Sequence, residues 1–305
     1  MTDHAPNALP LAPTISGPDP APRRPQVKFP AGACDSHVHI FGPQQSYPPA
    51  PNPGYIPHET PLTDLWRMLR AVGCERAVIV QPTFYGFDNR CVADALRTGD
   101  GQLRGVAGID LNTSEETLED LHRLGVRGIR LHLKGDTLAN ELINASRLAE
   151  RIRARGWHIQ FQLRMDTMPD VAGYLAKLPV DIVIDHFGYV SAANGMLEPG
   201  FQALLRLSRT GRCWFKLSAP YRLSKQPPQY HDVVPLVRAL VAMAPDRCVW
   251  GTDWPHATRT DSGMLPIPND GDLADMLADW IPDGALRHRV LVENPRRLYD
   301  FDCSG

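Results

Sequence analysis

This 305-residue chain lacks the features that mark several classes of protein. No apolar run approaches the roughly 18 residues of a membrane-spanning helix, and the N-terminus lacks the basic and apolar segments of a secretory signal. No glycine-rich dinucleotide fingerprint or phosphate loop follows a candidate strand. A formal net charge of −2 gives no reason to expect nucleic acid or a membrane as a partner. We therefore expect a cytoplasmic protein that binds neither.

Cysteines are few and scattered, and none forms a C-x-x-C pair. In a chain of this length such spacing is typical of reduced thiols rather than of a disulfide framework, in keeping with a cytoplasmic location. The six are Cys34, Cys74, Cys91, Cys213, Cys248 and Cys303.

Proline, in contrast, is abundant and concentrated in two stretches. Eight prolines lie between residues 6 and 30 among few large apolar side chains. Such a stretch buries too little surface to offset the entropy lost on ordering. We predict that residues 1–30 form a flexible or draped N-terminal arm and that residues 31–305 form a single folded domain. The second cluster, at 47–57, predicts a long loop after the first strand.

From Cys34 onward, short apolar runs alternate with amphipathic stretches typical of helices. The runs predict eight strands, at 34–41, 76–82, 104–111, 127–133, 157–163, 181–187, 213–218 and 247–254. Eight strands alternating with helices favour an α/β fold closed into a (β/α)8 TIM barrel. The alternative is an open doubly wound sheet, which the count of eight disfavours.

Polar side chains gather at the predicted strand ends, where TIM barrels carry their reacting groups. Because residues two apart share a face of a strand, Asp35, His37 and His39 lie together. Two adjacent imidazoles are harder to satisfy by ordinary packing than one. His186 and Asp253 stand at the ends of the sixth and eighth strands. We expect His37, His39, His186 and Asp253 to meet at one rim of the barrel.

Four motifs make the chain resemble the amidohydrolase superfamily: "DSHVHIFG" at the first strand, "DHFG" around His186, "GTDWPH" around Asp253, and the late "ENPRRLYDF". With "YGFDNR", "RGVAGIDL", "RGIRLHL" and "FKLSAPYR", it looks most similar to the 2-pyrone-4,6-dicarboxylate lactonase group. This resemblance implies a TIM barrel that hydrolyses a small carboxylated lactone. Related lactonases work without metal, which implies that none is required here.

A metal is the alternative that the resemblance leaves open, because many superfamily members hold one or two divalent ions. A two-metal site needs a lysine or glutamate on strand four and a histidine on strand five. Here strand four offers Arg130 and strand five offers Gln162, so we expect no such site. A single zinc on His37, His39, His186 and Asp253 is chemically compatible, since imidazole and carboxylate are good zinc ligands.

The chemistry of lactone hydrolysis assigns the remaining roles. We expect Asp253 to be the base that activates water, and the three histidines to donate to the oxyanion. We expect Arg130 and Arg222 to bind substrate carboxylates through their forked donors, unless each pairs with a carboxylate of the protein. Further substrate contacts are expected from Thr83, Tyr85, Tyr55, Gln162 and Ser218.

Three competing functions remain at this point. A metal-dependent nonoxidative decarboxylase of an aromatic or muconate acid would use the same four residues, but the missing strand-five histidine argues against it. A lactone isomerase differs only in whether water or a substrate hydroxyl attacks. A barrel kept only for binding would be expected to have lost one of the four polar residues. Assembly into a homo-oligomer is left open.

Overall fold

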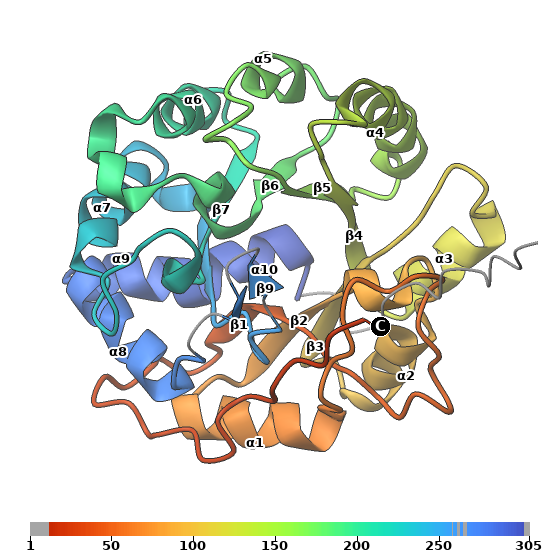
Figure 1. Cartoon of the computed structure of the whole chain (residues 1–305), viewed down its shortest axis with the longest axis horizontal. Helices are drawn as coiled ribbons and strands as arrows, with labels where there is room; N and C mark the ends of the chain where they lie inside the picture. The colour runs from red at the N-terminus through yellow and green to blue at the C-terminus, as the bar shows by residue number, and fades with distance from the viewer. Residues whose placement is uncertain (1–11, 258, 261–262, 265–266, 302–305) are drawn as a thin grey trace, which may run out of the picture.

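The structure, a computed structural model, describes residues 12–257, 259–260, 263–264 and 267–301. Eight parallel strands form one sheet in the order β1 to β8, and helices surround them (Figure 1). The strands are β1 (Cys34–Val38), β2 (Arg76–Val80), β3 (Leu103–Ala107), β4 (Val126–His132), β5 (His158–Gln162), β6 (Ile182–Ile184), β7 (Cys213–Ser218) and β8 (Cys248–Gly251). The predicted (β/α)8 barrel is therefore confirmed.

The barrel closes between β1 and the segment that follows β8. The backbone N–H of Asp253 donates to His37 O at 2.9 Å, and that of His39 donates to Trp254 O at 2.7 Å. A Cβ atom on Gly251 would stand 2.7 Å from His37 N, so only glycine lets the two strands approach this closely. This seam brings Asp253 beside the two histidines of β1.

Asp35 reinforces the same seam with its side chain. Its Oδ1 accepts from the backbone N–H groups of His37 and Thr252, each at 3.1 Å, and its Oδ2 accepts from Thr252 Oγ1 at 2.7 Å. The Asp35 carboxylate therefore ties β1 to the chain after β8. Although it shares a face with His37 and His39 in sequence, it serves the closure of the barrel.

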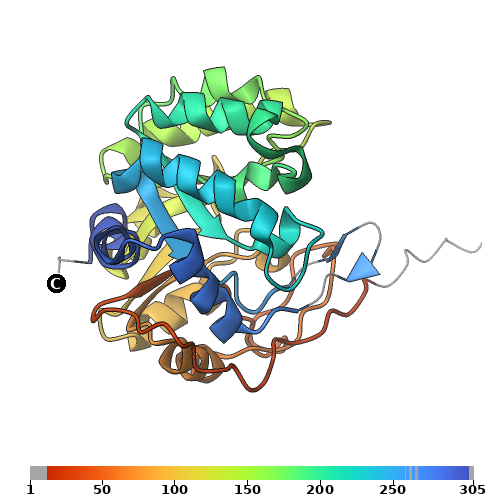
Figure 2. The ribbon, with the colours of Figure 1, turned by 90° about the vertical axis from the view of Figure 1, so that its left-hand side faces the viewer.

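Most helices form a ring outside the strands, whereas the last helix, Asn294–Tyr299, crosses one end of the barrel (Figures 1 and 2). The α-helices are α1 (Leu62–Val72), α2 (Arg90–Thr98), α3 (Glu115–Arg123), α4 (Leu138–Arg153), α5 (Val171–Leu175), α6 (Pro199–Ser208), α7 (Val234–Met243), α8 (Asp270–Trp280), α9 (Gly284–His288) and α10 (Asn294–Tyr299). The last two are joined by a π-helical turn, η7 (Arg289–Glu293).

Shorter elements complete the connections between strands and helices. The 3₁₀ turns are η1 (Thr83–Tyr85), η2 (Asp185–Tyr189), η3 (Ala192–Leu197), η4 (Pro220–Arg222), η5 (His231–Val233) and η6 (Pro245–Arg247). A two-stranded antiparallel ribbon, β9 (Arg259–Thr260) and β10 (Gly263–Met264), follows β8. Three of the turns, η1, η2 and η4, follow strands β2, β6 and β7, and they carry residues of the site described below.

Helix boundaries follow signals that are visible in the sequence. Gly73 ends α1 with a positive φ of 88°, and its N–H bonds to Leu69 O. Ser114 caps α3 by accepting from the N–H of Thr117 at 3.1 Å. Helix α4 is longer than its apolar pattern at 146–156 indicates, because it begins at Leu138.

The proline-rich N-terminal stretch lies against the barrel in its described part, residues 12–30. Thr14 pairs with Ile56 of the proline-rich loop, so the two proline-rich stretches contact each other. Arg23 forms ion pairs with Asp272 and Asp275 of α8 at 2.5 and 2.6 Å. Residues 1–11 lie outside the described residues.

Two expectations from composition concern thiols and membranes. Five cysteines, Cys34, Cys74, Cys91, Cys213 and Cys248, are buried free thiols, and Cys303 lies outside the described residues. Within the described ranges, the helices are all too short or too polar to cross a membrane.

Candidate active site

Four buried side chains meet at the C-terminal rim of the barrel, as the strand-end argument predicts. The Nε2 atoms of His37 and His39 lie 3.3 Å apart. Asp253 Oδ1 lies 3.5 Å from Nε2 of His37, 3.8 Å from Nε2 of His39 and 3.5 Å from Nε2 of His186. Three imidazoles from two strand ends therefore point at one carboxylate oxygen.

His39 has a tautomer that its surroundings fix. Its Nδ1 lies 2.7 Å from the carbonyl oxygen of Val80, which can only accept, so Nδ1 carries the proton. Burial, with a contribution from the Arg130 guanidinium, lowers the pKa of His39 to about 3. The ring is therefore neutral, and Nε2 presents a lone pair to the cluster.

His186 does not belong to a strand. Strand β6 ends at Ile184, and His186 lies in η2 with a left-handed φ of 48°, a conformation that costs energy for a non-glycine residue. Its Nδ1 lies 2.8 Å from Ser218 Oγ on β7. Its Nε2 has no hydrogen-bond partner among the described residues. Burial lowers the pKa of His186 to about 4.

Asp253 also adopts a left-handed backbone, with φ of 68°. Its Oδ2 accepts from Tyr221 Oη at 2.6 Å and from Arg222 Nε and Nη2 at 3.0 and 2.7 Å. Its Oδ1 has no hydrogen-bond partner within the described part of the chain. Burial alone would raise its pKa, but the Arg222 guanidinium and the nearby imidazoles hold the pKa well below the usual value.

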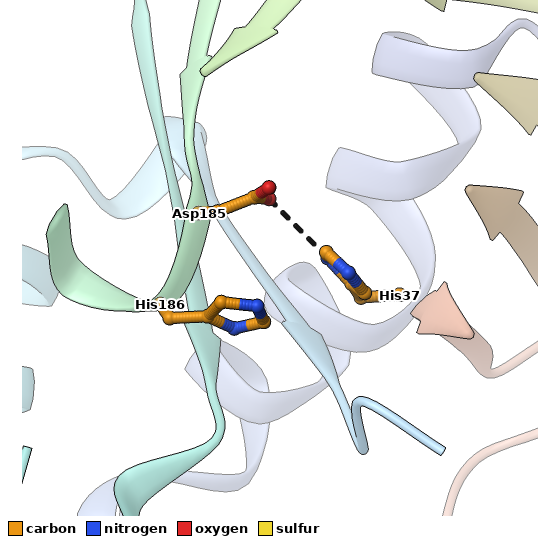
Figure 3. A group of neighbouring side chains, drawn as sticks. All are labelled: His37, Asp185 and His186. Atoms are coloured by element: carbon orange, nitrogen blue, oxygen red, sulfur yellow. Dashed lines mark ion pairs between the residues drawn. The ribbon is translucent and has the colours of Figure 1, made fainter. Parts of the chain in front are cut away.

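Two charged residues of the site, Asp185 and Lys216, were not assigned roles from the sequence. Asp185 Oδ1 lies 3.2 Å from His37 Nδ1, and the two side chains point toward each other (Figure 3). Lys216 Nζ lies 3.2 Å from the same nitrogen and donates to Gln160 Oε1 at 2.7 Å. Burial lowers the pKa of Lys216 to about 8. A carboxylate and an ammonium therefore share one ring nitrogen of His37.

The two arginines expected to bind substrate both pair with carboxylates of the protein. Arg130 contacts Asp185 Oδ2 through Nε and Nη2, each at 3.1 Å. Arg222 contacts Asp253 Oδ2 as given above, and its guanidinium stacks over the rings of Tyr189 and Tyr221. In each arginine, the contacts with the protein carboxylate are made by Nε and Nη2. Both side chains are at least partly buried.

The other predicted substrate contacts are distributed around this rim. Ser218 holds His186, as described. The hydroxyl of Tyr85 is buried and accepts from the N–H of Gly42 at 3.0 Å. Burial raises the pKa of Tyr55, and the neighbouring Thr83 hydroxyl opposes this shift. Gln162 ends β5 and lies beside His132 of β4.

A cavity of about 260 Å³ opens beside Arg130 and His132. Apolar side chains make up half of its lining. The remaining lining residues are Phe87, Ile109, Asp110, Leu111, Leu131, Glu141, Asn144 and Leu148.

Three residues of the cluster, His37, His39 and Asp253, have the spacing that a single zinc ion needs. Neighbouring ligand atoms of a tetrahedral zinc with bonds of about 2.0–2.1 Å lie about 3.4 Å apart. His37 Nε2 lies 3.3 Å from His39 Nε2, and Asp253 Oδ1 lies 3.5 and 3.8 Å from these two atoms. His39 Nε2 and Asp253 Oδ1 both offer lone pairs to the same point. His37, His39 and Asp253 therefore form one group that could hold a divalent ion, and His37, Asp185 and His186 form a second such group.

Comparison with known proteins relates this geometry to a family. The model of the family described as "Amidohydrolase" matches residues 34–301. The chain is 37% identical to a 2-pyrone-4,6-dicarboxylate hydrolase of Comamonas testosteroni, over 91% of this chain and 93% of that protein. It is 34% identical to a D-galactarolactone isomerase of Agrobacterium fabrum, over 90% and 93%. A solved structure, a putative 2-pyrone-4,6-dicarboxylic acid hydrolase from Pseudomonas putida, superposes with a TM-score of 0.75 at 35% identity, covering 90% of this chain and all of that one.

Proposed function

The chain belongs to the amidohydrolase family, and we propose that it hydrolyses the ring ester of a small lactone that carries one or more carboxylates. The observation that carries the proposal is the asymmetric carboxylate of Asp253. Its Oδ2 accepts three hydrogen bonds, while Oδ1 faces three imidazoles with no hydrogen-bond partner among the described residues. Relatives named for 2-pyrone-4,6-dicarboxylate and D-galactarolactone support the substrate class, which includes lactones from aromatic and sugar-acid breakdown.

In this proposal, Asp253 is the general base. A water molecule placed against Oδ1 gives its proton to that oxygen as its own oxygen attacks the lactone carbonyl carbon. The ring C–O bond then breaks, and the proton held by Asp253 passes to the departing ring oxygen. The product is a ring-opened acid with one more carboxyl group. Because the pKa of Asp253 is held low, the base is ionised at neutral pH.

The tautomer of each imidazole determines whether its Nε2 can donate a hydrogen bond to the oxyanion. His39 cannot donate from Nε2, because its proton is on Nδ1. His37, which has Lys216 beside its Nδ1, is free to carry its proton on Nε2 and share it with His39. If Ser218 donates to Nδ1 of His186, the Nε2–H of that ring is the donor available to the developing oxyanion. We therefore assign His186 as the principal oxyanion donor.

We also propose that turnover requires no metal. Each imidazole already has a cation near it: Lys216 beside His37, Arg130 beside His39 and Arg222 beside His186. These charges disfavour a second cation and themselves stabilise a developing oxyanion. A zinc ion held by His37, His39 and Asp253 would act as a Lewis acid on the lactone carbonyl. Metal analysis of the purified protein, with rates before and after chelation, tests this part.

The cytoplasm is the proposed setting of this reaction. Support comes from the five cysteines that the structure describes, all of them free thiols. Expression in the native host followed by cell fractionation tests this location.

A lactone isomerase is the second candidate, favoured by the D-galactarolactone isomerase relative. It would use the same base and oxyanion donor, with a hydroxyl of the substrate in place of water. The two reactions give different products, because hydrolysis leaves a ring-opened acid and isomerisation leaves a new lactone. Mass spectrometry of the products formed in ¹⁸O-labelled water distinguishes them, since only hydrolysis incorporates the label stoichiometrically.

A lactone screen tests the proposal as a whole. Carboxylated lactones and matched rings without the carboxylate are supplied to the protein with a pH indicator, with and without chelator. We expect acid release from at least one carboxylated lactone, none from its uncarboxylated partner, and no effect of chelation. Failure to open any carboxylated lactone, or carbon dioxide release from an aromatic or muconate acid, would refute the proposed reaction.

A further inference from the structure

Three buried side chains stand behind Asp253 and take no part in the steps above. Tyr221 lies in η4, His256 follows Asp253 by three residues, and Asp270 begins α8. Their exposed fractions are 4%, 4% and 0%. Buried polar groups destabilise a protein unless they are paired. These three are paired with one another, and the chain of contacts ends on the proposed base.

The direction of each hydrogen bond follows from counting protons. A carboxylate only accepts, so the single proton of the Tyr221 hydroxyl is donated to Asp253 Oδ2, at 2.6 Å. His256 Nδ1 lies 3.1 Å from the same hydroxyl oxygen and must therefore donate to it. His256 Nε2 lies 2.9 Å from Asp270 Oδ1, which also only accepts, so both ring nitrogens donate. The ring is then an imidazolium that is paired with, and oriented by, the Asp270 carboxylate.

The result of this order is a carboxylate with two unlike oxygens. Tyr221 and Arg222 supply three donors to Oδ2, and Oδ1 has none within the described residues. A carboxylate held by one side cannot exchange its oxygens by rotation without losing these bonds. The oxygen left over is the one that faces the three imidazoles.

We propose that Tyr221, His256 and Asp270 form a positioning relay that keeps Oδ1 of Asp253 aimed at the attacking water. This inference rests on the proposed role of Asp253 as base. Tyr221 acts on Asp253 directly, His256 acts through Tyr221, and Asp270 acts through His256. A base displaced by about 1 Å loses up to about 100-fold in rate, so the relay affects the chemical step more than substrate binding.

The test compares variants with a lactone that the wild-type protein opens. Tyr221→Phe should lower kcat by about 10- to 100-fold and leave KM within about threefold. His256→Leu removes the donor to Tyr221, whereas His256→Asn keeps an amide N–H near the position of Nδ1. We expect His256→Asn to recover at least about fivefold in kcat over His256→Leu, if one hydrogen bond of about 1 kcal/mol is restored.

An Asp253→Asn background separates positioning from general damage. Tyr221→Phe should not change the residual rate there, because it acts through the carboxylate. Three results would overturn the relay: a kcat of Tyr221→Phe within twofold of wild type, equal rates for the two His256 variants, or a further loss in the Asp253→Asn background.

A crystal structure of Tyr221→Phe keeps this test separate from that of the proposed function. If the wild-type protein opens no lactone, the proposed function fails, but the relay still predicts a rotated or disordered Asp253 carboxylate in the variant. An Asp253 side chain with Oδ1 still directed at the imidazoles would refute the relay by itself.

Discussion

His39 donates its Nδ1 proton to the carbonyl oxygen of Val80, 2.7 Å away. This bond leaves Nε2 as an acceptor, and the nearest carboxylate oxygen, Asp253 Oδ1, lies 3.8 Å from it and is also an acceptor. Two buried acceptors that face one point are stable only with a proton or a cation near them. The behaviour of the site therefore depends on where His37, the third member, carries its proton.

We expect Lys216 to determine which nitrogen of His37 carries the proton. Lys216 Nζ and Asp185 Oδ1 both lie 3.2 Å from Nδ1 of His37 and compete for it. When Lys216 donates, the proton of neutral His37 is on Nε2; when Nδ1–H donates to Asp185, Nε2 is free to bind a cation. Lys216→Met removes the first option and one positive charge. We expect the variant to bind zinc at least about 10-fold more tightly, measured by competition with a chromophoric chelator.

The exposed Lys177 supplies the control for this experiment. Lys177→Met removes the same charge from the surface and should leave zinc affinity unchanged. Equal affinities for Lys216→Met and wild type would show that the buried ammonium does not decide between proton and metal.

Arg130 and Arg222 should contribute to substrate binding in different ways. A charged hydrogen bond contributes about 1.5–3 kcal/mol, so Arg130→Met should raise KM for a carboxylated lactone by about 10-fold or more. Arg222→Met should raise KM and also lower kcat, because Arg222 donates twice to the base. Steady-state kinetics with Arg90→Met, an exposed arginine, as control measures both effects. If KM is unchanged in both variants, the substrate carboxylate is bound elsewhere.

The pH profile should be flat where histidine catalysts usually titrate. Asp253 stays ionised because its pKa is held low, and His39 and His186 stay neutral because burial lowers their pKa values to about 3 and about 4. We expect constant kcat/KM between about pH 5 and about pH 7. A decline should begin near pH 8, the pKa of Lys216, as that ammonium loses its charge beside His37.

Initial rates from pH 4.5 to 9.5, roughly the range in which these groups and ordinary histidines titrate, test this profile. Lys216→Met should lack the alkaline decline. An acid limb centred near 6.5, the ordinary pKa of histidine, would identify an imidazole as the base instead of Asp253.

Folding stability should fall in mild acid for a related reason. His39, His132 and His158 have pKa values lowered by burial to about 3, while an unfolded histidine titrates near 6.5. Below about pH 6.5 the unfolded chain therefore binds protons at these histidines while the folded chain does not. The free energy of unfolding should be highest above about pH 6.5 and should decrease as the pH falls toward about 4. His158 is buried in β5 and has no role in the proposed reaction, so it can be removed without touching catalysis.

Thermal unfolding of His158→Leu between pH 7 and pH 4.5, a window below the ordinary histidine pKa, measures its share. The Tm of the variant should fall less per pH unit than that of wild type, because the variant has one fewer histidine whose pKa is lowered by folding. The control His288→Asn alters a half-exposed histidine and should keep the wild-type slope. Identical slopes for His158→Leu and wild type would contradict this account.

The strands could be predicted from the sequence because apolar runs alternate with amphipathic stretches. Four residues of the site could be predicted because side chains alternate between the two faces of a strand. Apolar runs of strand length gave the barrel, and the ends of parallel strands must meet at one rim. His37 and His39 illustrate this well, since their spacing of two residues puts them on one face. The alternation argument failed at β6, which ends at Ile184.

After Ile184 the chain turns into η2, where His186 has a left-handed φ of 48°. For this reason Asp185 and His186, which alternation would place on opposite faces, both point into the site. The sequence motif contained Asp185, but nothing local shows that it bonds to a histidine 148 positions away. The role of Lys216 could not be predicted for the same reason, because a lysine on a strand indicates a charge but not the residue with which it pairs.

The catalytic rate of Asp253→Asn, on the lactone that the wild-type protein opens fastest, tests the central claim most directly. The change keeps the size of the side chain and its place among the imidazoles but removes the proton acceptor. We predict a kcat at least about 100-fold below wild type, with KM within a few fold and the fold intact by circular dichroism. A kcat within about threefold of wild type, well inside the loss expected for a missing base, would show that Asp253 is not the base.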